Sequence, residues 1–145
     1  MSRYSFGALA VQPVRSPAVP VRAIRGATTL DADTAEQIRE RVQALVAAVF
    51  ERNGLRTDDV VSLLVTATSD IRSAHPATAA RAWGLADVPI MGAQELAIDG
   101  GLELCVRLMF HVELDRAKRD VHHVFLERAV VLRPDLATPG PAPGR

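Results

Sequence analysis

The 145-residue chain contains a single cysteine, Cys105, and few aromatic residues, which make up 4% of it. One cysteine excludes an internal disulfide or a zinc site built from several cysteines, and it fits a reducing compartment. Lysine plus arginine number 17, as do aspartate plus glutamate, so the formal net charge is zero. This balance gives no electrostatic reason to expect nucleic acid or an anionic membrane as a partner.

Long apolar segments and the common catalytic motifs are also missing. No apolar run approaches the roughly 20 residues that cross a bilayer, and the N-terminus lacks the apolar stretch of a signal peptide, so we expect a cytoplasmic protein. The chain has no phosphate-binding loop, no G-x-G-x-x-G and no H-E-x-x-H. We predict no metal site, because the four histidines show no metal-ligand spacing. Cys105 has no partner base nearby in sequence and is expected to be a small buried residue.

Hydrophobic residues make up 48% of the chain, which suits one compact domain with an aliphatic core. Residues 1–19 contain several prolines and show no sustained period, so we expect a flexible extension. Residues 137–145, with the sequence ATPGPAPGR, have the composition of a flexible tail. The sequence therefore predicts a single domain over residues 20–136.

Periodicity within this domain predicts an α/β fold, an α+β arrangement with a mixed sheet. Asp33 or Thr34 can cap a helix whose apolar stripe runs to Gly54, a natural C-terminal stop. The nearly continuous apolar strand 60–66 is expected to be buried on both faces. Pro76 can open a short helix that carries Arg81. The other expected elements are strands at 21–27, 88–96, 102–114 and 124–132, and a short helix after Asp115 over 116–123.

The segment 102–114, LELCVRLMFHVEL, has strict alternation of apolar side chains with other residues. A period of two places Arg107 on the face opposite the apolar side chains. An enclosed arginine needs an anion or an electron-rich oxygen as its hydrogen-bond partner, so this face is expected to line a ligand site. A solvated outer face of an antiparallel sheet is the alternative.

Three further arginines lie at strand ends or on a short helix, and one acid precedes the Gly100-Gly101 turn. Arginine forks bind carboxylates in a bidentate manner, and several together suit a small dianion. Each arginine by itself is more often a surface or ion-pair residue, and the sequence does not establish that they converge. The residues concerned are Arg25, Arg81, Arg107, Arg133 and Glu95.

Five segments together resemble the monofunctional AroH-type chorismate mutases. They are IRGATT from Ile24, Gln94-Glu95, Gly100-Gly101-Leu102, Cys105-Val106-Arg107 and VVLRPDL from Val130. The similarity in order and spacing extends from about Val21 to Leu136. The resemblance implies a homotrimeric pseudo-α/β barrel, with sites in the clefts between subunits. It also implies a cofactor-free [3,3] rearrangement of chorismate to prephenate.

By this resemblance, three residues would be catalytic. Arg107 would donate to the ether oxygen, where negative charge builds up as the C–O bond breaks. Arg25 would bind a carboxylate and help to hold the substrate folded over its ring. Glu95 would accept the substrate hydroxyl and face the positive charge that develops on the ring.

The resemblance also implies a set of substrate-binding positions. Arg81 would contact the ring carboxylate at the site entrance, and Leu132 and Arg133 would belong to a C-terminal segment that closes over the site. Ala77 and Thr78 would line the pocket.

The chain departs from the family pattern at three of these positions. The family usually has tyrosine where this chain has Phe125, often cysteine at Gly92, and often an apolar aromatic residue at His75. A one-residue deletion also lies between Arg81 and Pro89. None of these differences removes Arg25, Glu95 or Arg107.

Two other functions remain as alternatives at this point. One is a non-enzymatic trimer that binds a small carboxylate or regulates through it, although Glu95 would repel such a ligand. The other is a different trimeric enzyme of similar architecture, such as a small-imine hydrolase, which would not need the full arginine set.

Overall fold

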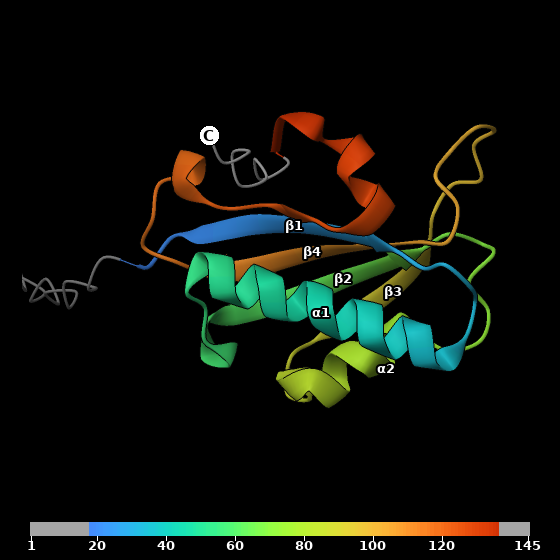
Figure 1. Cartoon of the computed structure of the whole chain (residues 1–145). Helices are drawn as coiled ribbons and strands as arrows, with labels where there is room; N and C mark the ends of the chain where they lie inside the picture. Colours follow the sequence, from blue (N-terminus) through green and yellow to red (C-terminus); the bar gives the residue numbers. More distant parts are fainter. Residues whose placement is uncertain (1–17, 137–145) are drawn as a thin grey trace, which may run out of the picture.

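The computed structural model describes residues 18–136, which form one five-stranded sheet flanked by helices (Figure 1). Of the two regions that we expect to be flexible, 137–145 lies wholly outside the described residues and 1–19 lies outside them except for residues 18 and 19. The strands are β1 (Val21–Thr29), β2 (Val60–Ala67), β3 (Ile90–Gln94), β4 (Cys105–Glu113) and β5 (Val124–Phe125). The helices are α1 (Ala35–Asn53) and α2 (Pro76–Ala80), with short helical turns η1 (Thr57–Asp59), η2 (Arg81–Leu85), η3 (Lys118–Asp120), η4 (Glu127–Leu132) and η5 (Pro134–Leu136).

The sheet is mixed and has the order β3-β2-β4-β1-β5. β4 is central and pairs antiparallel with β1 and β2, whereas β3 and β5 are parallel to their neighbours at the two edges. In this register Arg107 lies opposite Ala27 of β1 and Thr66 of β2. The predicted mixed α/β class is therefore confirmed.

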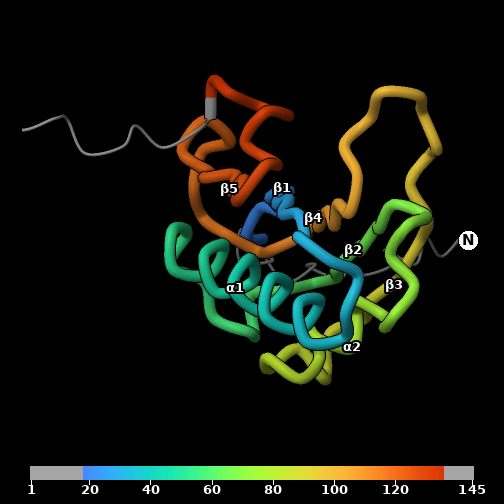
Figure 2. Tube along the Cα trace, turned by 45° about the vertical axis from the view of Figure 1, so that its right-hand side comes forward, coloured from blue at the N-terminus to red at the C-terminus, as the bar shows by residue number. Residues whose placement is uncertain are grey.

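Both helices pack on one side of the sheet, while the C-terminal segment and the loop after β3 extend on the other side (Figure 2). Four alternate residues of β4 face α1 and are at most 2% exposed: Val106, Leu108, Phe110 and Val112. The predicted alternation is thus confirmed within the strand. The strand begins only at Cys105, because Leu104 adopts a φ of 48° and its N–H donates to the Asp70 carboxylate.

The ends of α1 follow from its capping residues. The Thr34 hydroxyl accepts a hydrogen bond from the Gln37 N–H, and Gly54 ends the helix in the left-handed conformation at φ 61°. Of the two caps that the sequence allowed, Thr34 is therefore the one used. The Asp33 carboxylate instead accepts from the N–H groups of Arg72 and Ser73. No helix within residues 18–136 has both the length and the apolar character needed to cross a membrane.

Strand β2 is not buried on both faces, contrary to the prediction. Leu63 and Val65 face the helices and are buried, whereas Val61 and Leu64 are 45% and 40% exposed. The reason is that both helices cover the same side of the sheet. In the described chain, the other side of β2 has no covering layer.

The C-terminal region differs most from the prediction. Strand β5 has only two residues, and the predicted strand 124–132 continues as the 3-10 helix η4. Glu127 has a φ of 53°, which turns the chain away after the Leu126 N–H has donated to the Ala27 carbonyl. The turn buries Ala129 against Ala27.

The predicted helix over 116–123 is also wrong. Only the short turn η3 forms, and the chain is then extended at Val121. His122 and His123 instead make hydrogen bonds to residues distant in sequence, namely Asn53 and Arg25. These tertiary hydrogen bonds override the local helix propensity.

Candidate active site

Arg107 and Glu95 lie together on the face of the sheet opposite α1. Glu95 directly follows β3, where its N–H donates to the Ala67 carbonyl at 2.9 Å. Its carboxylate accepts a short hydrogen bond from the Thr66 hydroxyl and lies 3.2 Å from Nε of Arg107. Thr66 and Arg107 are register partners, so the strand pairing itself brings the acid and the arginine together.

Nε of Arg107 remains available as a donor despite this ion pair. The contact to Glu95 does not have hydrogen-bond geometry, and this buried nitrogen has no hydrogen-bond partner within residues 18–136. A buried donor without a partner is costly, so its presence indicates a group that a ligand oxygen can satisfy.

Arg25 belongs to the same face, because Ala27, two residues later on β1, lies directly opposite Arg107. Its Cζ lies 5.9 Å from the ring centroid of Phe125, a cation–π contact. Within the described part of the chain, the guanidinium forms no ion pair. Arg25 thus presents an uncompensated positive charge beside Arg107.

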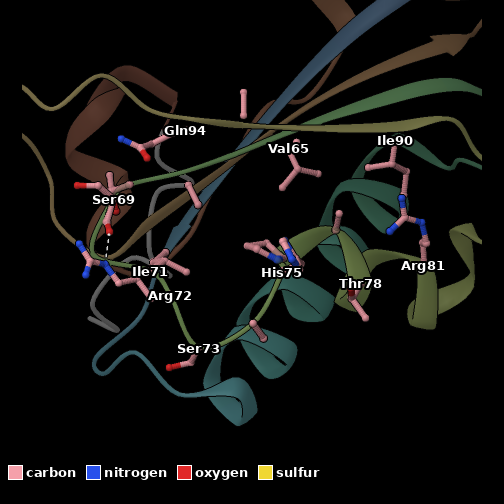
Figure 3. A pocket seen from close by; sticks show the side chains of 17 residues that line it. Val65, Ser69, Ile71, Arg72, Ser73, His75, Thr78, Arg81, Ile90 and Gln94 are labelled. Carbon is pink, nitrogen blue, oxygen red and sulfur yellow. Dashed lines mark hydrogen bonds between the residues drawn. The ribbon is translucent and has the colours of Figure 1, made fainter.

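A separate pocket of about 1170 Å³ lies along β2, β3 and the start of α2. Its lining includes three cationic or titratable basic side chains, Arg72, His75 and Arg81, and no aspartate or glutamate. In Figure 3, His75 lies between Arg81 at one end and Arg72 at the other. This arrangement suits an anionic ligand.

The described chain distributes the predicted site residues over two places. One set is Arg25, Glu95, Arg107, Phe125 and Leu132, of which Leu132 packs with Phe125 in a small cluster. The second set lines the pocket: His75, Ala77, Thr78, Arg81 and Gly92.

None of the first set lines the pocket, so one chain does not bring the two sets together. Arg133 belongs to neither set, because its guanidinium forms a bidentate ion pair with Asp135 at 2.8 and 3.0 Å.

Two residues near this site were missed from the sequence. Thr66 holds the Glu95 carboxylate, and the only available signal was a hydroxyl residue at the end of an apolar strand. Arg72 lines the pocket through a loop that shows no periodic pattern. The expectation for Cys105 is confirmed: the side chain is fully buried, and burial raises the pKa of its thiol. No group of three His, Cys, Asp or Glu side chains suited to a metal ion occurs within residues 18–136.

The structure is that of a mixed α/β protein in which Arg25 and Arg107 lie on one face of the sheet and Glu95 pairs with Arg107. The family model for chorismate mutase type I matches residues 21–136. The chorismate mutase AroH of Bacillus subtilis (strain 168) is 42% identical over 118 residues, which cover 81% of this chain and 93% of that protein.

The chorismate mutase AroH of Thermus thermophilus is 38% identical over 117 residues, or 80% of this chain and 96% of that protein. The solved structure of a chorismate mutase from Clostridium thermocellum matches with a TM-score of 0.74 and 43% identity. That match covers 75% of this chain and 97% of the other. The chain belongs to the chorismate mutase type I family.

Proposed function

We propose that this chorismate mutase rearranges chorismate to prephenate with Arg107, Glu95 and Arg25 as the groups that touch the reacting molecule. The observation that carries this assignment is the unpartnered Nε–H of Arg107, held beside a fixed carboxylate. In the rearrangement, the ether C–O bond breaks while a new C–C bond forms within the same molecule. The electrons move around a ring of six atoms, so the protein transfers no proton or electron.

Arg107 acts on the charge that develops at the breaking bond. Negative charge accumulates on the ether oxygen in the transition state, and a preorganised N–H donor stabilises that charge more than it stabilises the substrate. Glu95 accepts the substrate hydroxyl and faces the positive charge that develops on the ring. The Thr66 hydroxyl fixes the Glu95 carboxylate, which keeps that acceptor in place.

Arg25 binds a substrate carboxylate and holds the side chain folded over the ring. Its guanidinium lies over Phe125, which restricts its rotamers before the ligand arrives. Holding the compact conformer lowers the entropic part of the barrier. Leu132 closes the apolar side of this site. Arg133, which pairs with Asp135 within one chain, would reach the site from the segment after η4 only once that pair opens.

The active site forms between subunits of a homotrimer. The proposal is supported by the pocket that contains Arg81 and His75, which is separate from the Arg107 face within one chain, so that a second copy would be needed to bring them together. Large apolar side chains near β2 and β3 are exposed in the described chain and suit such an interface. They are Leu64, Met91, Leu96 and Ile98, with exposed fractions from 40% to 82%.

We place the trimer in the cytoplasm and in aromatic amino-acid biosynthesis. The alternatives, a carboxylate-binding trimer without activity or a small-imine hydrolase, lack support from the family and from the named relatives.

The first experiment follows the loss of chorismate absorbance with purified protein in buffer containing EDTA, with the oligomeric state measured by sedimentation. Saturable conversion to prephenate by a trimer supports the proposal. A folded trimer without conversion would favour the carboxylate-binding alternative, and an active monomer would overturn the shared site.

A further inference from the structure

The backbone pairing between strands β5 and β1 is short. The two strands pair only at Gly26 and Ala27. The N–H of Leu126 donates to the Ala27 carbonyl at this edge, and alternate residues of a strand direct their peptide groups to the same edge. The N–H of Arg25 therefore points to β5 at a level where β5 has not yet begun.

The imidazole of His123 supplies the missing acceptor. Nδ1 of His123 accepts the Arg25 N–H at 3.0 Å. A partly buried main-chain donor at this position would otherwise need a water or a strand partner. The side chain of His123 thus extends the β1–β5 ladder by one residue towards the N-terminus of β1.

The segment that carries His123 is itself fixed to the end of α1. Asn53 is fully buried. Its Nδ2 donates to the carbonyls of Val49 at 2.9 Å and His122 at 2.8 Å, and its Oδ1 accepts the His122 N–H at 2.8 Å. Both peptide groups of His122 are therefore held by one side chain, and His123 follows directly.

We propose that His123 is a positioning residue for Arg25, with Asn53 as its anchor. The unprotonated imidazole fixes the part of β1 from which the Arg25 guanidinium reaches the substrate carboxylate over Phe125. The ligand in this inference rests on the proposed function, whereas the link between His123 and the Arg25 backbone does not.

This link depends on pH, because Nδ1 accepts a hydrogen bond only when it carries no proton. Burial, followed by the charges of Arg25, Arg133 and His122, lowers the pKa of His123. Arg25 lies on β1, Arg133 follows η4, and His122 precedes His123 in sequence. None of these groups is an acid. The imidazole is therefore neutral at pH 7, and the link is lost only as the pH falls below the ordinary histidine value of about 6.5.

The test compares His123→Ala and His123→Asn with His122→Asn as the matched control. His122 is the exposed neighbour, and its side chain makes no hydrogen bond in the described chain. We expect His123→Ala to raise KM for chorismate by roughly three- to tenfold, the range for one lost hydrogen bond, and to lower kcat by a smaller factor because Arg25 itself is retained.

The carboxamide oxygen of asparagine can occupy the place of Nδ1 and does not titrate. His123→Asn should therefore keep the wild-type KM at pH 7.5 and lose the rise of KM that the wild type shows below about pH 6.5. The His122→Asn control should retain the KM at pH 7.5 and should still show a rise of KM in acid, because His123 is still present. An unchanged KM in His123→Ala, or the wild-type acid profile in His123→Asn, would overturn the inference.

A second readout does not depend on activity. The backbone amide resonance of Arg25 should shift with pH as His123 titrates in the wild-type protein, and should not shift in His123→Asn. If the chemical shift of the Arg25 amide does not change as His123 titrates, the link is overturned even if the protein is an active mutase. Protein that lacks mutase activity but shows this titration would contradict the proposed function alone. Should His123→Ala fail to fold, the asparagine variant and this resonance still decide the question.

Discussion

Replacing Arg107 with alanine separates its contribution to catalysis from its contribution to folding. Within residues 18–136 its one ion-pair contact is Glu95 at 3.2 Å, and the two side chains are 34% and 22% exposed. A partly exposed pair of this kind contributes about 0–1 kcal/mol. We therefore expect the free energy of unfolding to fall by no more than about 1 kcal/mol for loss of the pair. Loss of a donor to the developing oxyanion should cost roughly 3 kcal/mol, or at least about a hundredfold in kcat/KM.

The assay combines initial rates of chorismate loss with urea unfolding of the same preparations. Arg56→Ala is the control, because it removes an arginine from a surface ion pair. The guanidinium of Arg56 lies 3.6 Å from the Asp58 carboxylate, and the two side chains are 79% and 86% exposed. Arg107→Lys should also lose activity, since a point ammonium cannot reproduce the guanidinium geometry. A folded Arg107→Ala variant that keeps most of its kcat/KM would refute the assigned mechanism.

Three further predictions concern residues near this site or in the core. Phe125→Tyr should strengthen chorismate binding by about 0.5–1.5 kcal/mol, the contribution of one hydrogen bond, and so lower KM. An unchanged KM in steady-state kinetics would contradict this. Asn53→Ala removes three hydrogen bonds to Val49 and His122 and should lower the free energy of unfolding by about 3 kcal/mol in urea titrations; a loss below about 1 kcal/mol would show that water replaces them. Cys105, fully buried and with a raised thiol pKa, should react with a disulfide reagent at pH 8 only after unfolding, so rapid reaction of the native protein would argue against its placement.

The helix α1 could be predicted because the residues at its two ends determine where it begins and where it stops. Thr34 caps the first turn with its own hydroxyl, and Gly54 takes the left-handed conformation that other residues adopt at a cost. The apolar positions between them share one stripe, and the structure buries that stripe against β4. Local chemistry and tertiary packing agree here, so the prediction succeeded.

The region after β4 could not be predicted, because its structure depends on distant partners. The residues 124–132 have a strand-like apolar pattern, but only the first three of them, Val124 to Leu126, have a backbone partner on β1. Asn53 and Arg25 lie about 70 and 98 residues from the histidines that they bind. Sequence periodicity does not reveal hydrogen bonds between residues so far apart in the chain, and here these bonds decide between a helix and an extended segment.

The candidate site was partly predictable for a related reason. Alternation in β4 placed Arg107 away from the core, and the structure confirms this orientation. The proximity of Glu95 and Arg107 required the order of β2, β3 and β4 in the sheet, which no local pattern specifies. The resemblance identified both residues, but the pairing through Thr66 became visible only with the register.

The separation of the two residue sets within one chain has a consequence for activity. Arg25 and Arg107 lie on a face that the helices do not cover, while Arg81 lies in the pocket along β3. Under the proposed trimer, each site obtains Arg81 from a neighbouring subunit. An Arg81→Ala subunit and an Arg107→Ala subunit, each inactive alone, then form some complete sites when they are mixed and reassembled. A site contained in one chain would gain nothing from mixing, so recovery of activity distinguishes the two arrangements.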